Sequence, residues 1–286
     1  MQVNKSKVWP QLGAMAHELP CRVDEVEHLF ALLHSIELQA VQLGVPFLEE
    51  IMAREALLAT WQAQLKASSI QLSALGGYRN LITPDKARRA TNIAFLQRCL
   101  ELAPSLGTTI VATETGTYSR ASDWAASPAN QGQEAWEALY ASLNELLPVA
   151  ERYSVILALE GHVNHVINTP ERLARLLEQF PTPNLQVVLD PYNYLGKEQL
   201  PYKELIVASF LQQFKDRFAL VHLKDVHQQG AEVDTPAFGH GVFPQNIYLD
   251  FLQLQRPDLP LIIEHATVEQ FPAILHSLRT WHERTA

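Results

Sequence analysis

Cysteine is scarce in this sequence. Its 286 residues include only Cys21 and Cys99, which lie far apart and form no CxxC pair. Disulfide scaffolds and thiolate zinc sites both depend on several closely spaced cysteines. The sequence therefore argues against both arrangements, and it favours a reducing cytoplasm as the location of the protein.

Long apolar runs and an excess of basic residues are also missing. The N-terminus, MQVNKSKVWPQLGAMA, has no continuous apolar core like that of a signal peptide, and no run reaches membrane-spanning length. The 31 acidic residues outnumber the 22 basic ones, for a formal net charge of -9. Nucleic acids and anionic membranes select for clustered Lys and Arg, so neither is expected as the main partner. We expect a small-molecule ligand, and a few local basic groups would suffice to hold a phosphorylated one.

Short apolar runs alternate along the whole chain with longer segments of helical periodicity. The segment Val23–His34, for example, places Val26, Leu29, Phe30 and Leu33 on one face of a helix. We expect further helices over 48–66, from Thr83-Pro84 to Gly107, over 134–153, from Thr169-Pro170, and over 200–217 and 268–284. The expected strands are Lys7–Leu12, Ser35–Gln39, Ser69–Ala74, 108–116, 155–160, 184–190, 218–225 and 259–265.

Eight strand–helix units over this length predict a single (β/α)8 TIM barrel that spans residues 1–286 as one domain. The strands are nearly continuous apolar runs, as expected for parallel strands that are buried on both faces. An open doubly wound sheet is the alternative. That fold usually has a Gly-rich fingerprint after its first strand, and QLGAMA does not match GxGxxG.

Four consecutive late strands end in side chains that can bind a metal. They are Glu160, Asp190, His222 and Glu264. The carboxyl ends of barrel strands meet at one rim, where the chemistry of such proteins takes place. Three carboxylates and one imidazole suit a hard or borderline divalent ion, with Mn2+ first and Mg2+, Co2+ or Zn2+ as alternatives. Without a cation, crowded carboxylates repel one another, so the sequence predicts a metal site here.

These strand ends carry a resemblance to a known family. The segments LALEGH, VVLDPYN, LVHLKDV and LIIEHA resemble the sugar phosphate isomerase/epimerase family of the xylose isomerase-like TIM barrels. That superfamily also includes ketose 3-epimerases, inosose dehydratases and endonuclease-IV-type enzymes. SIELQ and IQLSALGGYRNL resemble its second and third strands, and PAFGHGVFP, residues 236–244, resembles its Gly-x-Gly loop. The resemblance covers most of the chain.

The resemblance implies roles for the four residues. Glu160, Asp190, His222 and Glu264 would bind the metal, and the two glutamates would also act as an acid/base pair on the two faces of a bound ketose. One would remove the proton beside the carbonyl group, and the other would return a proton through an enediolate. The resemblance thus implies a metal-dependent isomerase or epimerase of a ketose or sugar phosphate. By analogy, a homodimer or homotetramer is expected.

Two positions depart from the ketose 3-epimerase pattern. Asn193 stands where those enzymes place a histidine, and the loop LKDVHQQG lacks their arginine. An inosose-type dehydratase therefore stays open, and so does a noncatalytic sugar-binding barrel. The endonuclease relatives use further histidines that this chain lacks, so DNA repair is not expected.

Four residues near the predicted rim are candidate substrate ligands. Lys224 and His162 lie two residues beyond His222 and Glu160, and alternation along a strand places them on the same side. Asn193 follows the sixth strand and Glu114 ends the fourth. The polar segment GTYSRASDWAASPANQGQ, residues 116–133, follows Glu114, and loops of that length are uncommon unless functional. We expect it to be a lid.

Overall fold

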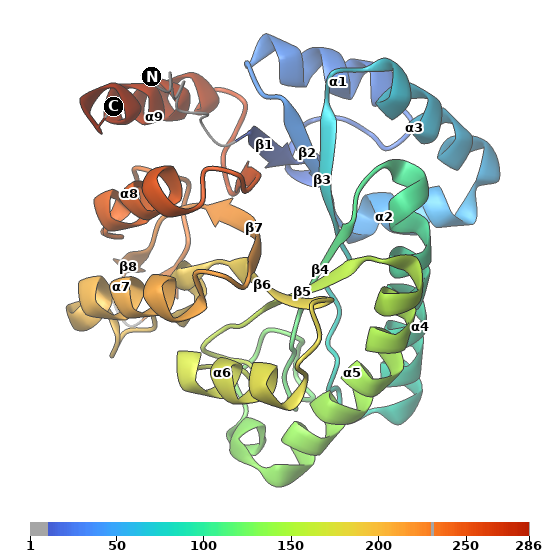
Figure 1. The fold of residues 1–286 in the computed structure, drawn as a ribbon, viewed down its shortest axis with the longest axis vertical. Helices are drawn as coiled ribbons and strands as arrows, with labels where there is room; N and C mark the ends of the chain where they lie inside the picture. The colour runs from blue at the N-terminus through green and yellow to red at the C-terminus, as the bar shows by residue number, and fades with distance from the viewer. Residues whose placement is uncertain (1–10, 230–231, 286) are drawn as a thin grey trace, which may run out of the picture.

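Eight parallel strands close into a barrel that helices surround (Figure 1). The structure is a computed structural model that describes residues 11–229 and 232–285. Around the barrel the strand order is β1-β10-β7-β6-β5-β4-β3-β2, so each strand pairs with its sequence neighbour in the barrel. The predicted TIM barrel is confirmed. Its strands are β1 Leu12–Met15, β2 Ala40–Leu43, β3 Gln71–Gly76, β4 Ile110–Glu114, β5 Ile156–Glu160, β6 Leu185–Leu189, β7 Phe218–Leu223 and β10 Leu261–Ile263.

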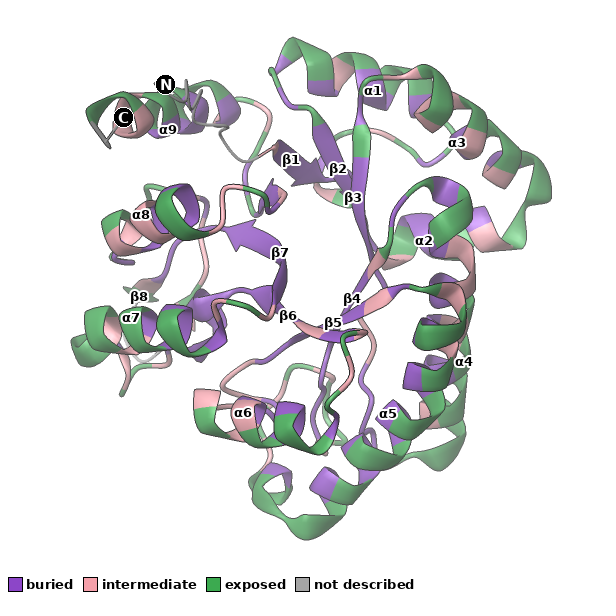
Figure 2. Cartoon of the chain, viewed as in Figure 1, coloured by how far each residue is buried: buried purple, intermediate pink, exposed green. Residues whose placement is uncertain are grey.

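Helices cover the outside of the barrel, with their inner faces buried and their outer faces exposed (Figure 2). Each has apolar residues at helical spacing that pack against the strands, as expected for a layer between a sheet and water. The helices are α1 Val26–Ser35, α2 Val45–Ala53, α3 Glu55–Ala67, α4 Lys86–Leu102, α5 Gln133–Tyr153, α6 Pro170–Gln179, α7 Lys203–Phe214, α8 Gln245–Gln255 and α9 Phe271–Thr285. Among the described residues, no helix is both long enough and apolar enough to cross a membrane.

Alanines make up half of the buried cluster inside the barrel. Ala74, Ala112, Ala158 and Ala219 form one buried cluster with Met15, Val188, Leu220 and Ile262, separate from the larger core between strands and helices. In β4, β5 and β10, for example, alternate residues point to these two cores. Small residues inside leave room for larger polar side chains at the carboxyl ends of the strands.

The predictions for the first two strands need correction. The first strand is Leu12–Met15, and residues 7–10 of the predicted one lie outside the described residues. The second prediction, Ser35–Gln39, is wrong because α1 continues through Ser35 and the strand begins only at Ala40. Glu37 adopts a left-handed conformation with φ 59°, which makes the turn between helix and strand.

Two helix predictions also differ from the structure. The segment 48–66 is two helices, since Arg54 takes an extended conformation between α2 and α3. Thr83 is not the N-cap of the next helix. Asp85 caps α4, because its Oδ1 accepts hydrogen bonds from the backbone N–H groups of Ala87 and Arg88 at 3.0 and 3.1 Å. The predicted Thr169 cap of α6 is confirmed.

The Asp225 side chain holds the loop that follows β7. The Asp225 carboxylate accepts hydrogen bonds from the backbone N–H groups of Val226, Gly239 and Phe243. A side chain on Gly241 would lie 2.4 Å from the same carboxylate, so only glycine fits there. The loop also contains an antiparallel hairpin of β8 His227–Gln229 and β9 Glu232–Asp234. Asp225 therefore fixes the polypeptide next to the carboxyl end of β7.

We expect Asp85→Ala to lower the free energy of unfolding by about 1 kcal/mol, since two N–H groups at the start of α4 lose their acceptor. Asp85→Asn should retain most of that stability because asparagine caps helices about equally well. Urea unfolding followed by circular dichroism measures both changes. Equal losses in the two variants would contradict the assigned cap.

Candidate active site

Four side chains converge at the carboxyl end of the barrel. Glu160 ends β5, Asp190 follows β6, His222 lies in β7 and Glu264 follows β10. The His222 Nδ1 atom lies 3.3 Å from Glu160 Oε2, 3.3 Å from Asp190 Oδ2 and 3.3 Å from Glu264 Oε1. Three carboxylates from three strand ends thus face a single imidazole nitrogen.

The donor atoms fit a divalent cation. One ligand atom each from Glu160, Asp190 and His222 lies within 4.8 Å of the others. Two neighbouring ligands that bind one ion at about 2.1 Å are themselves about 3.0 to 3.4 Å apart, which matches the 3.3 Å separations. Asp190 Oδ1 is buried and has no hydrogen-bond partner. The predicted residues are therefore brought together in a group that suits a divalent metal, with Glu264 beside it.

A buried ammonium group lies against the same carboxylates. Lys224 Nζ is 2.7 Å from Asp190 Oδ2 and 2.9 Å from Glu264 Oε2, and its side chain is only 5% exposed. Burial would raise the pKa of Asp190, but Lys224 and then His222 hold it well below its usual value. Burial would lower the pKa of Lys224, but the neighbouring carboxylates, Asp190 first, raise it. Lys224 therefore remains charged and offsets part of the negative charge.

The same charges act on His222 and on the two glutamates. Burial would lower the pKa of His222, but the carboxylates, Glu264 first, raise it to about 10. The pKa of Glu160 is raised by burial and then by Asp190. Burial also favours the protonated form of Glu264, yet His222 and Lys224 outweigh it and lower its pKa. The two glutamates therefore differ in their affinity for a proton.

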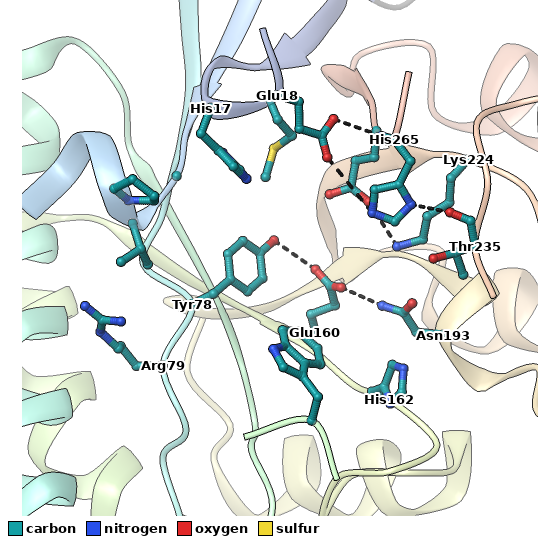
Figure 3. Close-up of a pocket in the computed structure, with 16 residues that line it drawn as sticks. His17, Glu18, Tyr78, Arg79, Glu160, His162, Asn193, Lys224, Thr235 and His265 are labelled. Carbon is teal, nitrogen blue, oxygen red and sulfur yellow. Dashed lines mark hydrogen bonds and ion pairs between the residues drawn. The ribbon is translucent and has the colours of Figure 1, made fainter. Parts of the chain in front are cut away.

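Glu160 has two further partners. Tyr78 donates a hydrogen bond from its hydroxyl to Glu160 Oε2 at 2.8 Å, and Asn193 donates from Nδ2 to Oε1 at 2.5 Å (Figure 3). Both carboxylate oxygens are held, so the orientation of the group is fixed. Asn193, predicted as a substrate ligand, thus contacts a predicted metal ligand directly.

The glutamates form the floor of a cavity of about 500 Å³. Asp190 and His222 do not line this cavity, because both side chains are fully buried beneath it. His162 lies on one side and Arg79 on the other in Figure 3. The lining residues are Met15, His17, Glu18, Gly44, Val45, Pro46, Tyr78, Arg79, Trp124, Glu160, His162, Asn193, Lys224, Thr235, Glu264 and His265.

The predicted lid segment contributes an aromatic wall to this cavity. Trp124 lines it with half of its surface exposed, and its ring lies 5.9 Å from that of His162. The segment is tied down: Asn164 donates a hydrogen bond to the backbone oxygen of Trp124, and Asp123 accepts one from Asn80. Movement of the segment as a lid stays a prediction.

Glu114 lies apart from the other candidates. It is 3% exposed and does not line the cavity, although β4 pairs with β5 so that Glu114 stands next to Glu160 in register. Its Oε2 atom has no hydrogen-bond partner. Burial, and then repulsion from Glu160, raises the pKa of Glu114 to about 8, so it is protonated at neutral pH. A protonated carboxyl group is a poor metal ligand.

Sequence reasoning missed Gln42 and Tyr78. Gln42 is fully buried and contacts His222, and Tyr78 contacts Glu160. A signal for Gln42 was present, because AVQLG, like LALEG, places a polar residue near the end of an apolar run. Because the second strand was predicted to end at Gln39, Gln42 was not placed at a strand end. Nothing in the sequence near Tyr78 points to Glu160, which lies 82 residues away.

Loss of a predicted ligand should abolish metal binding. After Mn2+ reconstitution and desalting, we expect about one ion per chain in the wild type and far less in Asp190→Asn and His222→Ala. Glu114→Gln is the matched control, since it removes a neighbouring buried carboxyl group and should retain the ion. Atomic absorption measures the content. Full occupancy in Asp190→Asn would contradict the assigned site.

Glu114 should also make stability depend on pH. Its pKa in the folded protein is raised to about 8 from an ordinary value of 4.5, so the folded state loses stability as the pH rises through this range. Each unit of pKa difference corresponds to about 1.4 kcal/mol. We expect Glu114→Gln to gain stability relative to the wild type between pH 5 and 8.5. Urea unfolding at pH 5 and at pH 8.5, with EDTA to remove metal ions, measures the free energy of unfolding of both proteins. If the difference between them is the same at both pH values, the assigned pKa of Glu114 is contradicted.

Comparisons with known proteins agree with this architecture. A family model described as "Xylose isomerase-like TIM barrel" matches residues 30–282. A search of the curated proteins finds no similar sequence. Among solved structures, 3-keto-D-glucoside 4-epimerase YcjR from E. coli, in its apo form, superimposes with a TM-score of 0.72 at 18% identity, covering 95% of this chain and 99% of that one.

Two further structures show the same fold. The IolI protein with a bound zinc atom has a TM-score of 0.70 at 16% identity, with 94% of this chain and 96% of that chain covered. The probable 3-DHS dehydratase AsbF from Bacillus anthracis has a TM-score of 0.74 at 13% identity, with 94% and 98% covered. The family match extends over most of the sequence, and the closed barrel agrees with it. The chain belongs to the xylose isomerase-like TIM barrel family.

Proposed function

We propose that this protein is a metal-dependent isomerase or epimerase of a sugar. One observation carries the proposal. Glu160 and Glu264, on two different strand ends, both face the same cavity and both lie 3.3 Å from His222 Nδ1. Two carboxylates that share a cation site and a substrate cavity can transfer a proton at adjacent positions of one ligand.

The site residues have distinct roles in this proposal. Glu160, Asp190, His222 and Glu264 would hold a divalent ion, which would polarise the carbonyl and hydroxyl oxygens of a ketose. Lys224 lies against Glu264 and favours its ionised form, which would remove the proton from the carbon next to the carbonyl. The raised pKa of Glu160 suits it to return a proton.

Proton return decides the reaction. Return to the opposite face of the same carbon gives an epimer, and return to the neighbouring carbon gives an isomer. Tyr78 and Asn193 hold both oxygens of Glu160 and thus fix the direction from which that proton arrives. Lys224 and His162 line the same cavity and are proposed to bind substrate hydroxyl groups.

A dehydratase is the second candidate, and Lys224 is the observation that favours it. Removal of the same proton can be followed by loss of a hydroxyl group from the next carbon. The Lys224 ammonium lies among the carboxylates at the floor of the cavity, where it can donate a proton to that hydroxyl. A stable unsaturated product distinguishes this outcome from isomerisation.

The proposal predicts solvent exchange at a substrate carbon. We expect the Mn2+-loaded protein in D2O to place deuterium next to the carbonyl of at least one member of a panel of free ketoses, ketose phosphates and 3-keto-D-glucosides. Glu264→Gln and Glu160→Gln should each lower the rate by a factor of about 10³ or more, since each removes one proton-transfer group. Nuclear magnetic resonance identifies the labelled position and the product.

Glu114→Gln serves as the control and should exchange like the wild type. Ligand binding that persists in Glu264→Gln without exchange would support the enzyme. Equal exchange in Glu264→Gln and the wild type would refute the role of that glutamate. Binding without exchange in the wild type would instead assign the protein to noncatalytic sugar-binding barrels.

A further inference from the structure

We propose that Gln42 is a positioning residue that sets the orientation and tautomer of His222 and, through Tyr78, the orientation of Glu160. The inference rests on the metal site of the proposed function. It concerns the chain's own contacts beneath the cavity, and it assigns a role to an amide that touches neither the ion nor the substrate.

Gln42 is directed into the barrel by the alternation of its own strand, because Val41 and Leu43 on either side belong to the outer core. It belongs to β2 and is fully buried. The pairing of β2 with β3 shifts register between Val41 and Gln42, because Val41 pairs with Leu72 whereas Gln42 pairs with Ala74. The extra residue, Ser73, belongs to β3, and the shift sets the small side chain of Ala74 opposite Gln42. A buried amide destabilises the protein unless its polar atoms are bonded, and those of Gln42 find their partners at the site.

Hydrogen bonds connect His222 to Glu160 through Gln42 and Tyr78, and the donor of each bond can be assigned. Gln42 Oε1 lies 3.2 Å from His222 Nε2, Gln42 Nε2 donates to the Tyr78 hydroxyl at 3.4 Å, and that hydroxyl donates to Glu160. Because the Tyr78 hydroxyl proton is donated to Glu160, the Tyr78 oxygen accepts from Gln42. The Gln42 amide nitrogen is thereby assigned to Tyr78, and its oxygen faces His222.

The orientation of the Gln42 amide determines which nitrogen of His222 is available to a metal. An amide oxygen accepts, so it holds a proton on His222 Nε2 and selects the Nε2–H tautomer of the neutral ring that a metal requires. The nitrogen left for a divalent ion is then Nδ1, which faces Glu160, Asp190 and Glu264. Partners of this kind fix the ring and strengthen the ligand, and their loss typically costs 10- to 100-fold in metal affinity.

Space for the amide is provided by a glycine on the next strand. A side chain at Gly76 would place its Cβ 3.0 Å from Gln42 Nε2 and 2.9 Å from the Tyr78 ring. Both distances are shorter than a normal van der Waals contact. The glycine, the register shift and the buried glutamine thus come from adjacent strands and serve one arrangement.

The test compares two variants of Gln42. Gln42→Met has a similar volume but cannot accept the Nε2 proton, and we expect it to weaken Mn2+ binding by about 10- to 100-fold. Gln42→Glu keeps an acceptor at that position, and we expect an affinity within about tenfold of the wild type. Electron paramagnetic resonance of free Mn2+ measures both. If Gln42→Met does not fold, Gly76→Ala displaces the same amide and should weaken Mn2+ binding in the same direction.

A second readout follows the ring itself. In proton nuclear magnetic resonance spectra of the Zn2+-loaded protein, the signal of a hydrogen-bonded His222 Nε2 proton should be present in the wild type, Gln42→Glu and Tyr78→Phe. It should be absent in Gln42→Met. If Gln42→Met binds Mn2+ with an affinity within about threefold of the wild type, the proposal is overturned, because the loss of such a partner should weaken binding by at least about tenfold. An equally large loss in Gln42→Glu would overturn it too. Because neither readout involves a sugar, failure of the proposed function would leave this result unchanged.

Discussion

The site depends on the concentration of negative charge around one imidazole. Three carboxylates lie 3.3 Å from His222 Nδ1 in a region that is almost closed to water. Coulomb repulsion between buried like charges is strong, since little solvent screens them. Cations stabilise such a group. The Lys224 ammonium and, without a metal, the protonated His222 ring supply positive charge, and the geometry of the oxygens suits a divalent ion.

The barrel makes this arrangement possible by combining rigidity with empty space. Each carboxylate stands at or just after the end of a strand that is hydrogen-bonded to a neighbouring strand on each side. The backbone therefore holds the carboxylates close together. Inside, alanines at four strand positions leave room for large polar side chains above them. The charge is therefore stabilised by fixed partners and does not rely on rearrangement of the chain.

The partners of the two glutamates make them chemically different. Glu264 lies next to the Lys224 ammonium, whereas Glu160 is held by the neutral groups of Tyr78 and Asn193. Opposite charge favours the ionised form of a carboxyl group, and burial without it favours the protonated form. Two residues of one type thereby become suited to two different proton-transfer roles in the proposed reaction.

The sequence by itself determined the alternation of strands and helices, and hence the barrel, together with the four polar residues at its late strand ends. Apolar periodicity is a local property, so it can be read along the chain. It could not separate Ser35 from the preceding helix, because the turn at Glu37 depends on a left-handed backbone conformation. Only the tertiary structure decided that Glu114 is excluded from the cavity, that Lys224 bridges Asp190 and Glu264, and that Gln42 and Tyr78 support the site. These contacts join residues 34 to 180 positions apart in the chain, and closure of the barrel sets their distances.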